Sequence, residues 1–288
     1  MPELPEVETV RRGLQKLIIG KQIVAETHNT DKSFPNEANE VAEFLLGTTV
    51  TKVRRRAKVL LIDLSSNYTL VTHLKMTGQL VYRGEQVFGA GHPNDSLIGE
   101  LPDRSTRVVI EFTDQTFLYF NDQRKFGWMR LLPTIAVPEI DFMKRVGPEP
   151  LEDEFTAEVF FGRLQRRKNT TIKAAILDQT VVAGIGNIYA DESLWGAQIH
   201  PATRVADVPA SSVQRLTSEM KSVMLLSIEK GGSTDRNYVN AEGKKGSYID
   251  FARVFRRENL PCPRCGTTII KTRVAGRGTH LCPTCQKI

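Results

Sequence analysis

The first six residues bring together side chains that suit nucleophilic chemistry. Removal of the initiator methionine, which is usual before a small residue, leaves Pro2 with a free secondary amine. An α-amino group titrates near a pKa of about 7.7–8.0 and a lysine near about 10.4, so far more of the α-amino group is unprotonated at pH 7. Such an amine can attack a sugar or carbonyl carbon, and the iminium ion that it then forms is an electron sink. Glu3 and Glu6 follow at a spacing that places both carboxylates in the first turn of a helix, near the amine.

The same residues also suit an ordinary helix start. Proline is common at the first helical position, and acidic residues in the first turn complement the helix dipole. An apolar stripe at helical spacing follows, and Gly20 ends it. The residue types alone therefore leave a catalytic and a purely structural interpretation of the amino terminus open. The stripe consists of Val7, Val10, Leu14, Leu17 and Ile18.

All four cysteines lie near the carboxyl terminus, as two Cys-x2-Cys pairs separated by sixteen residues. Four thiolates at this spacing are typical of a structural zinc site, in which they complete a tetrahedron around one Zn2+. Disulfide bonds would need an oxidising compartment, of which the sequence carries no sign. We therefore predict one structural zinc ion and no nucleotide or redox cofactor. The predicted ligands are Cys262, Cys265, Cys282 and Cys285.

The residues between the two cysteine pairs predict a β-hairpin, with strands over Ile269–Ala275 and Thr279–Leu281. The tripeptide Gly276-Arg277-Gly278 would form the tip of this hairpin. A single arginine between glycines projects from such a tip and can reach a groove or a phosphate. The alternative is an arginine in an ordinary solvated turn.

Length and charge limit the possible classes of protein. The chain has 288 residues, of which 40% are hydrophobic and 25% charged, so it has room for two domains of ordinary size. No apolar run approaches the length of a membrane span and no signal peptide is evident, which predicts a cytoplasmic protein. Residues 253–288 contain eight Lys or Arg and one acid, a net +7, so the total of +6 leaves −1 for residues 1–252. A basic end on a nearly neutral body is typical of nucleic-acid-binding proteins.

The first half of the chain has the pattern of an all-β domain that begins with one helix. Short runs rich in Val, Ile, Thr and aromatic residues alternate with turn-forming residues, which predicts an antiparallel β-sandwich or barrel over residues 1–133. Residues 85–104 are predicted as a long surface loop, and the proline-rich residues 134–150 as a linker. The predicted strands are Ile23–His28, Val50–Arg56, Val59–Leu64, Thr69–Leu74, Leu80–Arg83, Arg107–Thr113 and Thr116–Asn121.

Beyond the linker the apolar period becomes that of helices, which predicts a helical domain over residues 151–251 followed by the zinc hairpin over 252–288. Gly184 and Gly186 form a tight turn that enters a helix, and Asn187 is placed to cap it. A dinucleotide-binding fingerprint would need a third glycine and a preceding strand, both of which are missing. The predicted helices are Phe155–Lys168, Ile172–Asp178, Ile188–Gln198 and Ser211–Lys230.

Three stretches resemble bacterial formamidopyrimidine-DNA glycosylases, enzymes that excise oxidised purines such as 8-oxoguanine. They are PELPEVETVRRGL from residue 2, DQTVVAGIGNIYADESLW from residue 178 and VAGRGTHLCPTC from residue 274. The resemblance covers essentially the whole chain. It implies an α+β fold, in which a β-sandwich with an amino-terminal helix precedes a helical domain with a helix–two-turns–helix element and a carboxy-terminal zinc-finger β-hairpin. The implied partner is damaged double-stranded DNA, bound by a monomer and away from any membrane.

The resemblance also implies roles for individual residues in catalysis. The Pro2 nitrogen would attack C1′ of the flipped nucleotide, with Glu3 assisting the opening of the sugar ring and Glu6 in support. The iminium ion would then acidify C2′, so that β- and δ-elimination cut the strand. Lys58 stands where the family has its β-elimination lysine, and Arg277 where it has the arginine of δ-elimination. From residue type alone, Lys58 could equally be a solvated charge at the end of a strand.

A base inside a duplex must leave the stack before it can be attacked, and the hole that it leaves must be filled. The resemblance implies that Met76, Arg124 and Phe126 fill it, although residue type alone would assign Met76 and Phe126 to the core. It also implies that a loop over about Thr234–Ser247 covers the flipped purine. Further DNA contacts are implied for His73, Lys125, Lys168, Lys173 and Asn187.

Some features leave alternatives open. Lys168 and Lys173 could belong to a basic helix face, and Ser105 or Thr106 stands where the family usually has a histidine, whose DNA contact therefore cannot be carried over. The nearest rival function is that of endonuclease VIII, which acts on oxidised pyrimidines. A non-catalytic DNA-binding protein would have no use for the amine nucleophile, and an RNA-binding zinc protein would need a cluster of stacking aromatics.

Overall fold

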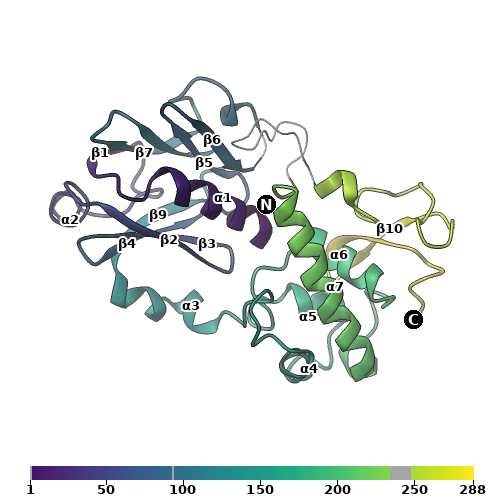
Figure 1. The fold of residues 1–288 in the computed structure, drawn as a ribbon. Coiled ribbons are helices and arrows are strands. Elements are labelled where there is room, and N and C mark those ends of the chain that lie inside the picture. Colours follow the sequence, from purple (N-terminus) through teal and green to yellow (C-terminus); the bar gives the residue numbers. More distant parts are fainter. Residues whose placement is uncertain (1, 93, 234–247) are drawn as a thin grey trace. The chain divides into compact units, whose positions relative to one another are not determined.

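The computed structural model describes residues 2–92, 94–233 and 248–288, which fold as two compact units (Figure 1). The first unit is built from residues 1–144 and 230–247, and the second from residues 145–229 and 248–288. The carboxy-terminal hairpin shares the second unit with the helices. The predicted lesion-covering loop, Thr234–Ser247, lies outside the described residues.

The first unit is an antiparallel β-sandwich, as the alternating pattern predicts. A five-stranded sheet has the order β1-β7-β8-β5-β6, and a four-stranded sheet has the order β2-β3-β4-β9. Inward-facing Val, Leu, Ile and Phe side chains of both sheets share one core. The strands are β1 Ile23–His28, β2 Val50–Arg56, β3 Val59–Leu64, β4 Tyr68–His73, β5 Gly78–Arg83, β6 Val87–Gly91, β7 Thr106–Phe112, β8 Phe117–Asp122 and β9 Trp128–Pro133.

Helix α1, Leu4–Leu17, is buried in the same core by its apolar stripe. Its close approach to β6 depends on Gly13, because a Cβ atom there would lie 2.1 Å from the ring of Phe88. The helix that carries the amino terminus is thus held against the sandwich along its length. This rigid base fixes where the first residues of the chain lie.

One prediction for the first half was wrong, and two elements, strand β9 and helix α2, were not predicted. Residues 85–104 are not one loop, since they contain strand β6 and the 3-10 helix η1, Asp95–Leu97. The sequence did not predict this strand because it contains Gly89 and Gly91, and glycine normally indicates a turn. Pairing with β5 provides the tertiary support that the local sequence does not. The short helix α2, Ala38–Phe44, was also not predicted, and it buries none of its residues fully.

The predicted linker, residues 134–150, contains regular structure. It forms a 3-10 helix η2, Thr134–Glu139, and a short helix α3, Asp141–Arg145. Val137 packs with Val59 and Val71 on the outer face of the four-stranded sheet. Much of this segment therefore belongs to the sandwich.

The second unit contains the helices that the helical spacing of its apolar residues predicts, although their first and last residues differ from the predicted ones. The zinc hairpin packs on them through a small core in which Trp195 of α6 meets Val254, Cys262 and Ile269. The described elements are α4 Ala157–Gln165, α5 Ile172–Leu177, α6 Asn187–Gly196, η3 Val205–Asp207, α7 Ala210–Glu229, η4 Tyr248–Phe251, β10 Ile270–Val274 and β11 Arg277–Leu281.

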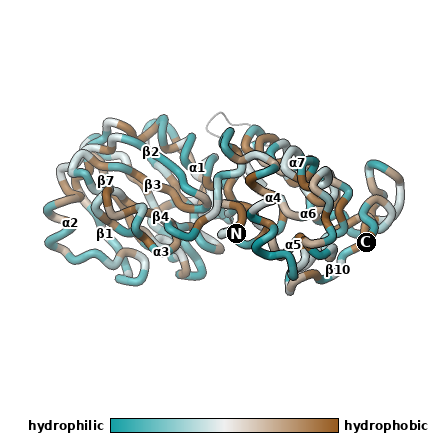
Figure 2. Tube along the Cα trace, turned by 90° about the horizontal axis from the view of Figure 1, so that it is seen from below, coloured by the Kyte–Doolittle hydropathy of each residue, from teal (hydrophilic) through white to brown (hydrophobic). Residues whose placement is uncertain are grey.

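Hydrophobic and hydrophilic residues are interleaved along the chain in both units (Figure 2). Among the described residues, no helix is long and apolar enough to cross a membrane.

Candidate active site and nucleic-acid interface

The start of α1 is buried, and the carboxylate of Glu6 holds it to residue 233, which is far away in the sequence. Pro2 and Glu3 are buried, and Glu3 is the N-cap residue of the helix. The Glu3 amide donates to Oε2 of Glu6 over 2.7 Å, and the Ser233 amide donates to Oε1 of Glu6, also over 2.7 Å. Glu6 therefore ties the residues next to Pro2 to the segment that leads into residues 234–247.

Lys58 lies in the two-residue turn that joins β2 to β3, where Arg56 pairs with Val59. Ala57, the other turn residue, has φ +52°, a conformation that favours glycine and costs energy for alanine. The Lys58 side chain is only 6% exposed. This burial excludes a freely solvated lysine at a strand end, which was the structural alternative for this residue.

A network around Glu8 connects α1 to the turn that carries the lysine. Burial raises the pKa of Glu8, but hydrogen bonds from Arg11 and Arg12 and the charge of Arg55 outweigh it and lower the pKa to about 2. The Arg55 guanidinium donates to Glu8 Oε2 over 3.2 Å and to the Ala57 carbonyl over 3.0 Å. Sequence reasoning missed this role of Glu8, because the pairing with Arg55 spans 47 residues.

His73 ends strand β4, where it pairs with Val59 next to the lysine turn. Burial lowers the pKa of His73 to about 3, with further contributions from the charges of Lys75 and Lys58. The Nδ1 atom of His73 accepts the Lys75 amide over 3.0 Å. We therefore assign the proton of the neutral ring to Nε2, which can donate a hydrogen bond to an acceptor such as a phosphate oxygen.

Met76 and Phe126 are exposed on two loops of the first unit, by 37% and 44% of their surface. This finding excludes the assignment of either side chain to the core. Each follows a lysine in the left-handed conformation, with φ +49° at Lys75 and +57° at Lys125. The guanidinium of Arg124 lies 4.8 Å from the centre of the Phe126 ring. These two loops present apolar and cationic groups to solvent, as a void-filling role requires.

In the second unit, the segment between α5 and α6 is held by a glutamine that sequence reasoning missed. The Gln179 side chain accepts the Gly184 amide over 2.9 Å and donates to the Ile185 carbonyl over 2.8 Å. Gly184 has φ +80°, which favours glycine. The two turns are thereby fixed by one side chain. Lys168, which follows α4 and was predicted on that helix, is exposed.

Lys173, for which the resemblance implies a DNA contact, lies in the interior of the second unit. Its side chain is fully buried, and its ammonium donates to Asp191 Oδ1, Thr279 Oγ1 and the Gly278 carbonyl over 2.6, 2.7 and 3.1 Å. Asp191 also accepts the amide of His280 over 2.9 Å. The lysine therefore fastens the hairpin to α5 and α6. Its position at a helix start, in a basic stretch, could not reveal this partner.

Asn187 is not the cap of α6, because Gly186 occupies that position and Asn187 is the first helical residue. Its Nδ2 atom donates to the Gly278 carbonyl over 2.9 Å. Its Oδ1 atom has no hydrogen-bond partner among the residues that the structure describes. Asn187 and Lys173 thus hold the same carbonyl of the hairpin.

The hairpin turn also differs from the prediction. Val274 pairs with Arg277, so the turn consists of Ala275 and Gly276, with φ +49° and +73°. Two positive φ angles are typical of a two-residue hairpin turn that matches the strand twist. Arg277 is therefore the first residue of β11 and is exposed. The flanking glycines suggested a turn that starts one residue too late and ends two residues too late.

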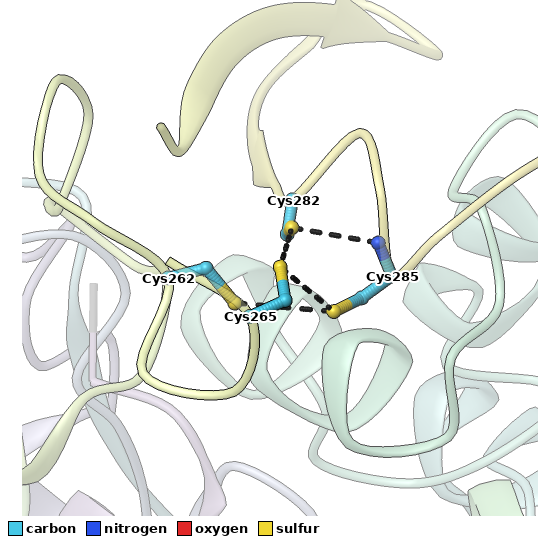
Figure 3. Close-up of side chains that lie close together, drawn as sticks. All are labelled: Cys262, Cys265, Cys282 and Cys285. Carbon is cyan, nitrogen blue, oxygen red and sulfur yellow. Dashed lines mark hydrogen bonds between the residues drawn. The ribbon is translucent and has the colours of Figure 1, made fainter. Parts of the chain in front are cut away.

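The four cysteine sulfur atoms gather within 4.8 Å of one another (Figure 3). The Sγ atoms of Cys265 and Cys282 lie 3.5 Å apart, and those of Cys262 and Cys285 lie 4.0 Å apart. Zinc–sulfur bonds of about 2.3 Å at tetrahedral angles place the sulfurs about 3.8 Å apart, so the cluster suits one structural zinc ion. The Trp195 indole donates to the Cys262 sulfur over 3.4 Å. No pair of cysteines forms a disulfide.

Three family profiles match consecutive parts of the chain. They are described as the formamidopyrimidine-DNA glycosylase N-terminal domain over residues 1–129, the formamidopyrimidine-DNA glycosylase H2TH domain over 146–238, and the zinc finger found in FPG and IleRS over 259–288. The formamidopyrimidine-DNA glycosylase of Pelotomaculum thermopropionicum is 41% identical, with the whole of both chains aligned. That of Streptococcus pyogenes serotype M6 is also 41% identical, over 100% of this chain and 99% of its own. The chain belongs to the formamidopyrimidine-DNA glycosylase family.

Solved structures of family members agree with this assignment. A Lactococcus lactis FPG variant in complex with Fapy-dG-containing DNA superimposes with a TM-score of 0.87 at 33% identity, over 100% of both chains. The MutM (FPG) protein of Thermus thermophilus superimposes with a TM-score of 0.83 at 36% identity, over 99% of this chain and 98% of its own. Members of the family are DNA N-glycosylases with lyase activity at abasic sites. The zinc site that the cysteine spacing predicted and the α+β fold that the resemblance implied are confirmed.

The structure also shows how the segment that departs from the family pattern is held. Ser105 and Thr106 are 2% and 6% exposed, so neither presents a side chain to a phosphate. Ser105 donates to Asp103 Oδ1 over 2.7 Å, and Thr106 donates to Asn121 Oδ1 over 2.9 Å. Both residues therefore hold the start of β7 and do not replace the missing histidine contact.

Proposed function

We propose that this chain excises oxidised purines from duplex DNA and then cuts the strand by β,δ-elimination. The observation that carries the proposal is the arrangement at α1, where Pro2 immediately precedes the N-cap of a buried helix that the Glu8–Arg55 network connects to the Lys58 turn. A nucleophilic amine and a lysine held by the same scaffold suit a reaction that opens a sugar and then abstracts a proton. Relatives solved with Fapy-dG and with abasic-site DNA support this substrate class.

In the proposed reaction the Pro2 nitrogen bonds to C1′, the glycosidic bond breaks, and Glu3 donates a proton to the ring oxygen as the sugar opens. The iminium ion between Pro2 and C1′ draws electrons from C2′, so that loss of a C2′ proton expels the 3′ phosphate. Lys58 takes part in this β-elimination. Arg277 of the second unit assists the δ-elimination that expels the 5′ phosphate. Water then hydrolyses the iminium ion, which frees the Pro2 amine and releases the sugar remnant as an unsaturated aldehyde, and a one-nucleotide gap remains.

The DNA contacts divide between the two units. Met76, Arg124 and Phe126 fill the space left by the flipped nucleotide. Lys125 and His73, also of the first unit, bind phosphates of the DNA. Lys168 and Asn187 contribute from the second unit, Asn187 through the second N–H of its side-chain Nδ2, whose first N–H donates to the Gly278 carbonyl. Lys173 acts indirectly by fastening the hairpin. We place this reaction at the chromosome in the bacterial cytoplasm, with the protein acting as a monomer.

The test is borohydride trapping of purified protein whose amino terminus has been sequenced. The substrate is a duplex with one 8-oxoguanine, and the matched proteins are the wild type, Pro2→Gly and a form that retains Met1. We expect a covalent protein–DNA product from the wild type that disappears in both altered forms.

Other outcomes would redirect the proposal. Trapping with an oxidised pyrimidine but not with 8-oxoguanine would assign the substrate class of endonuclease VIII. Tight binding without trapping on any lesion would identify a non-catalytic DNA-binding protein.

A further inference from the structure

Asp122 is a buried carboxylate that receives hydrogen bonds from both loops that carry exposed apolar side chains. It lies at the end of β8 and is 0% exposed. Its Oδ2 atom accepts the amides of Phe126 and Gly127 over 2.8 and 2.6 Å, and its Oδ1 atom accepts the amide of Arg124 over 3.2 Å. The hydroxyl of Thr77 also donates to Oδ1. One carboxylate thus serves four donors.

Thr77 connects the two loops directly as well as through the carboxylate. It follows Met76 and precedes Gly78, which pairs with Asp122 across strands β5 and β8. The Thr77 hydroxyl oxygen accepts the Arg124 amide over 3.0 Å while its proton goes to Asp122. The loop with Met76 and the loop with Phe126 are 45 residues apart at this contact, yet they share one hydrogen-bond network.

The backbone of Asp122 is fixed by residues outside both loops. The buried guanidinium of Arg107 donates to the Asp122 carbonyl over 2.8 Å, and the Asp122 amide donates to the Ser105 carbonyl over 2.7 Å. Gly127 has no room for a side chain, because a Cβ atom would lie 2.7 Å from Phe120 and 3.1 Å from Asp122 Oδ2. The carboxylate is therefore held in place independently of the loops that it binds.

We propose that Asp122 and Thr77 are positioning residues that couple the two loops, so that Met76 and Phe126 enter the DNA stack as one unit. This inference rests on the proposed function, in which these side chains fill the space of the flipped nucleotide. Insertion of two groups from separate loops is entropically costly unless their relative position is set beforehand. A carboxylate suits this task because it only accepts, and four donors converge on it.

The test compares Thr77→Val with Thr77→Ser. Valine keeps the shape of threonine but removes both hydrogen bonds of the hydroxyl, while serine keeps them. The substrate is a duplex with 8-oxoguanine and 2-aminopurine in the opposite strand beside the lesion, so that fluorescence reports insertion and gel analysis reports base release. A second substrate, a single-stranded oligonucleotide with an abasic site, has no base-pair hole to fill.

We expect Thr77→Val to slow both insertion and base release by about tenfold or more, and Thr77→Ser to restore both rates. Trapping on the single-stranded abasic site should change by less than about twofold. In a double-mutant cycle, the effects of Met76→Ala and Phe126→Ala on the fluorescence change should be coupled in the wild type and additive in Thr77→Val.

Equal duplex rates for the valine and serine variants would overturn the inference, and so would an equal loss of trapping on single-stranded DNA. A wild-type protein that releases no oxidised base from any duplex would instead overturn the proposed function. The fluorescence cycle still decides the coupling in that case, because it measures insertion without chemistry.

Discussion

Replacing Lys173 with methionine would test whether this lysine fastens the hairpin or binds DNA. Methionine keeps most of the volume but removes the ammonium, which leaves the carboxylate of Asp191 buried with one lost ion-pair partner. Breaking a buried pair in this way costs about 3–5 kcal/mol of unfolding free energy, because the remaining charge loses its cationic partner and keeps the hydrogen bond from the His280 amide. The hydrogen bonds to Thr279 and Gly278 are lost as well. We therefore expect a strongly destabilised second unit.

The assay is urea unfolding in a Trp128→Phe background, which leaves Trp195 of the second unit as the sole tryptophan. Lys168→Met is the matched control, because this exposed lysine should change the unfolding free energy by no more than about 0.5 kcal/mol. Displacement of the backbone beside Arg277 should also shift the cleavage products from δ- toward β-elimination. The reasoning is refuted if Lys173→Met keeps its stability within about 1 kcal/mol while the salt slope of DNA binding falls by about one, since that pattern marks a direct phosphate contact.

Two further results are expected. The pKa of His73 lies at about 3 in the folded protein and about 6.5 when unfolded, so its contribution to stability is present above pH 6.5 and is lost as the pH falls toward 3. Urea unfolding at pH 7 and pH 5 should therefore show that His73→Gln loses less unfolding free energy on acidification than the wild type does. An identical loss in both proteins would contradict the burial of the ring. Cys265→Ser should release zinc and abolish DNA binding, measured by metal analysis and gel shift, while the first unit keeps its fold; retained binding without zinc would show that the hairpin does not need the metal.

The chemistry-bearing residues were predictable where their signal is local. The spacing of Cys262, Cys265, Cys282 and Cys285 needs no knowledge of the fold, because each pair supplies two ligands from one short segment. The apolar stripe of the first helix and the alternating strands are local in the same sense. These patterns were enough to identify the sandwich, the helices and the zinc site.

The remaining features depend on partners that are far apart in the sequence. Glu6 and Ser233 are 227 residues apart, so no local pattern shows that one carboxylate holds both. The sequence around Lys173 indicates a surface lysine, whereas in the fold Asp191 and the hairpin surround its ammonium group. Strand β6 exists because β5 pairs with it, although its glycines suggest a loop. In each case the tertiary contact overrides the local preference.

The small core shared by Trp195 and the cysteines determines which part of the protein depends on the supply of zinc. Because Cys262 packs in the same cluster as Trp195 of α6, the ion stabilises a helix as well as a hairpin. The amine of Pro2 belongs to the other compact unit, which has its own core. When zinc is scarce, we therefore expect newly made protein to retain its reactive end but lose its hold on DNA. Repair capacity in a zinc-starved cell would then decline through weaker affinity and through loss of the part of Arg277 in δ-elimination, while the amine nucleophile itself stays in place.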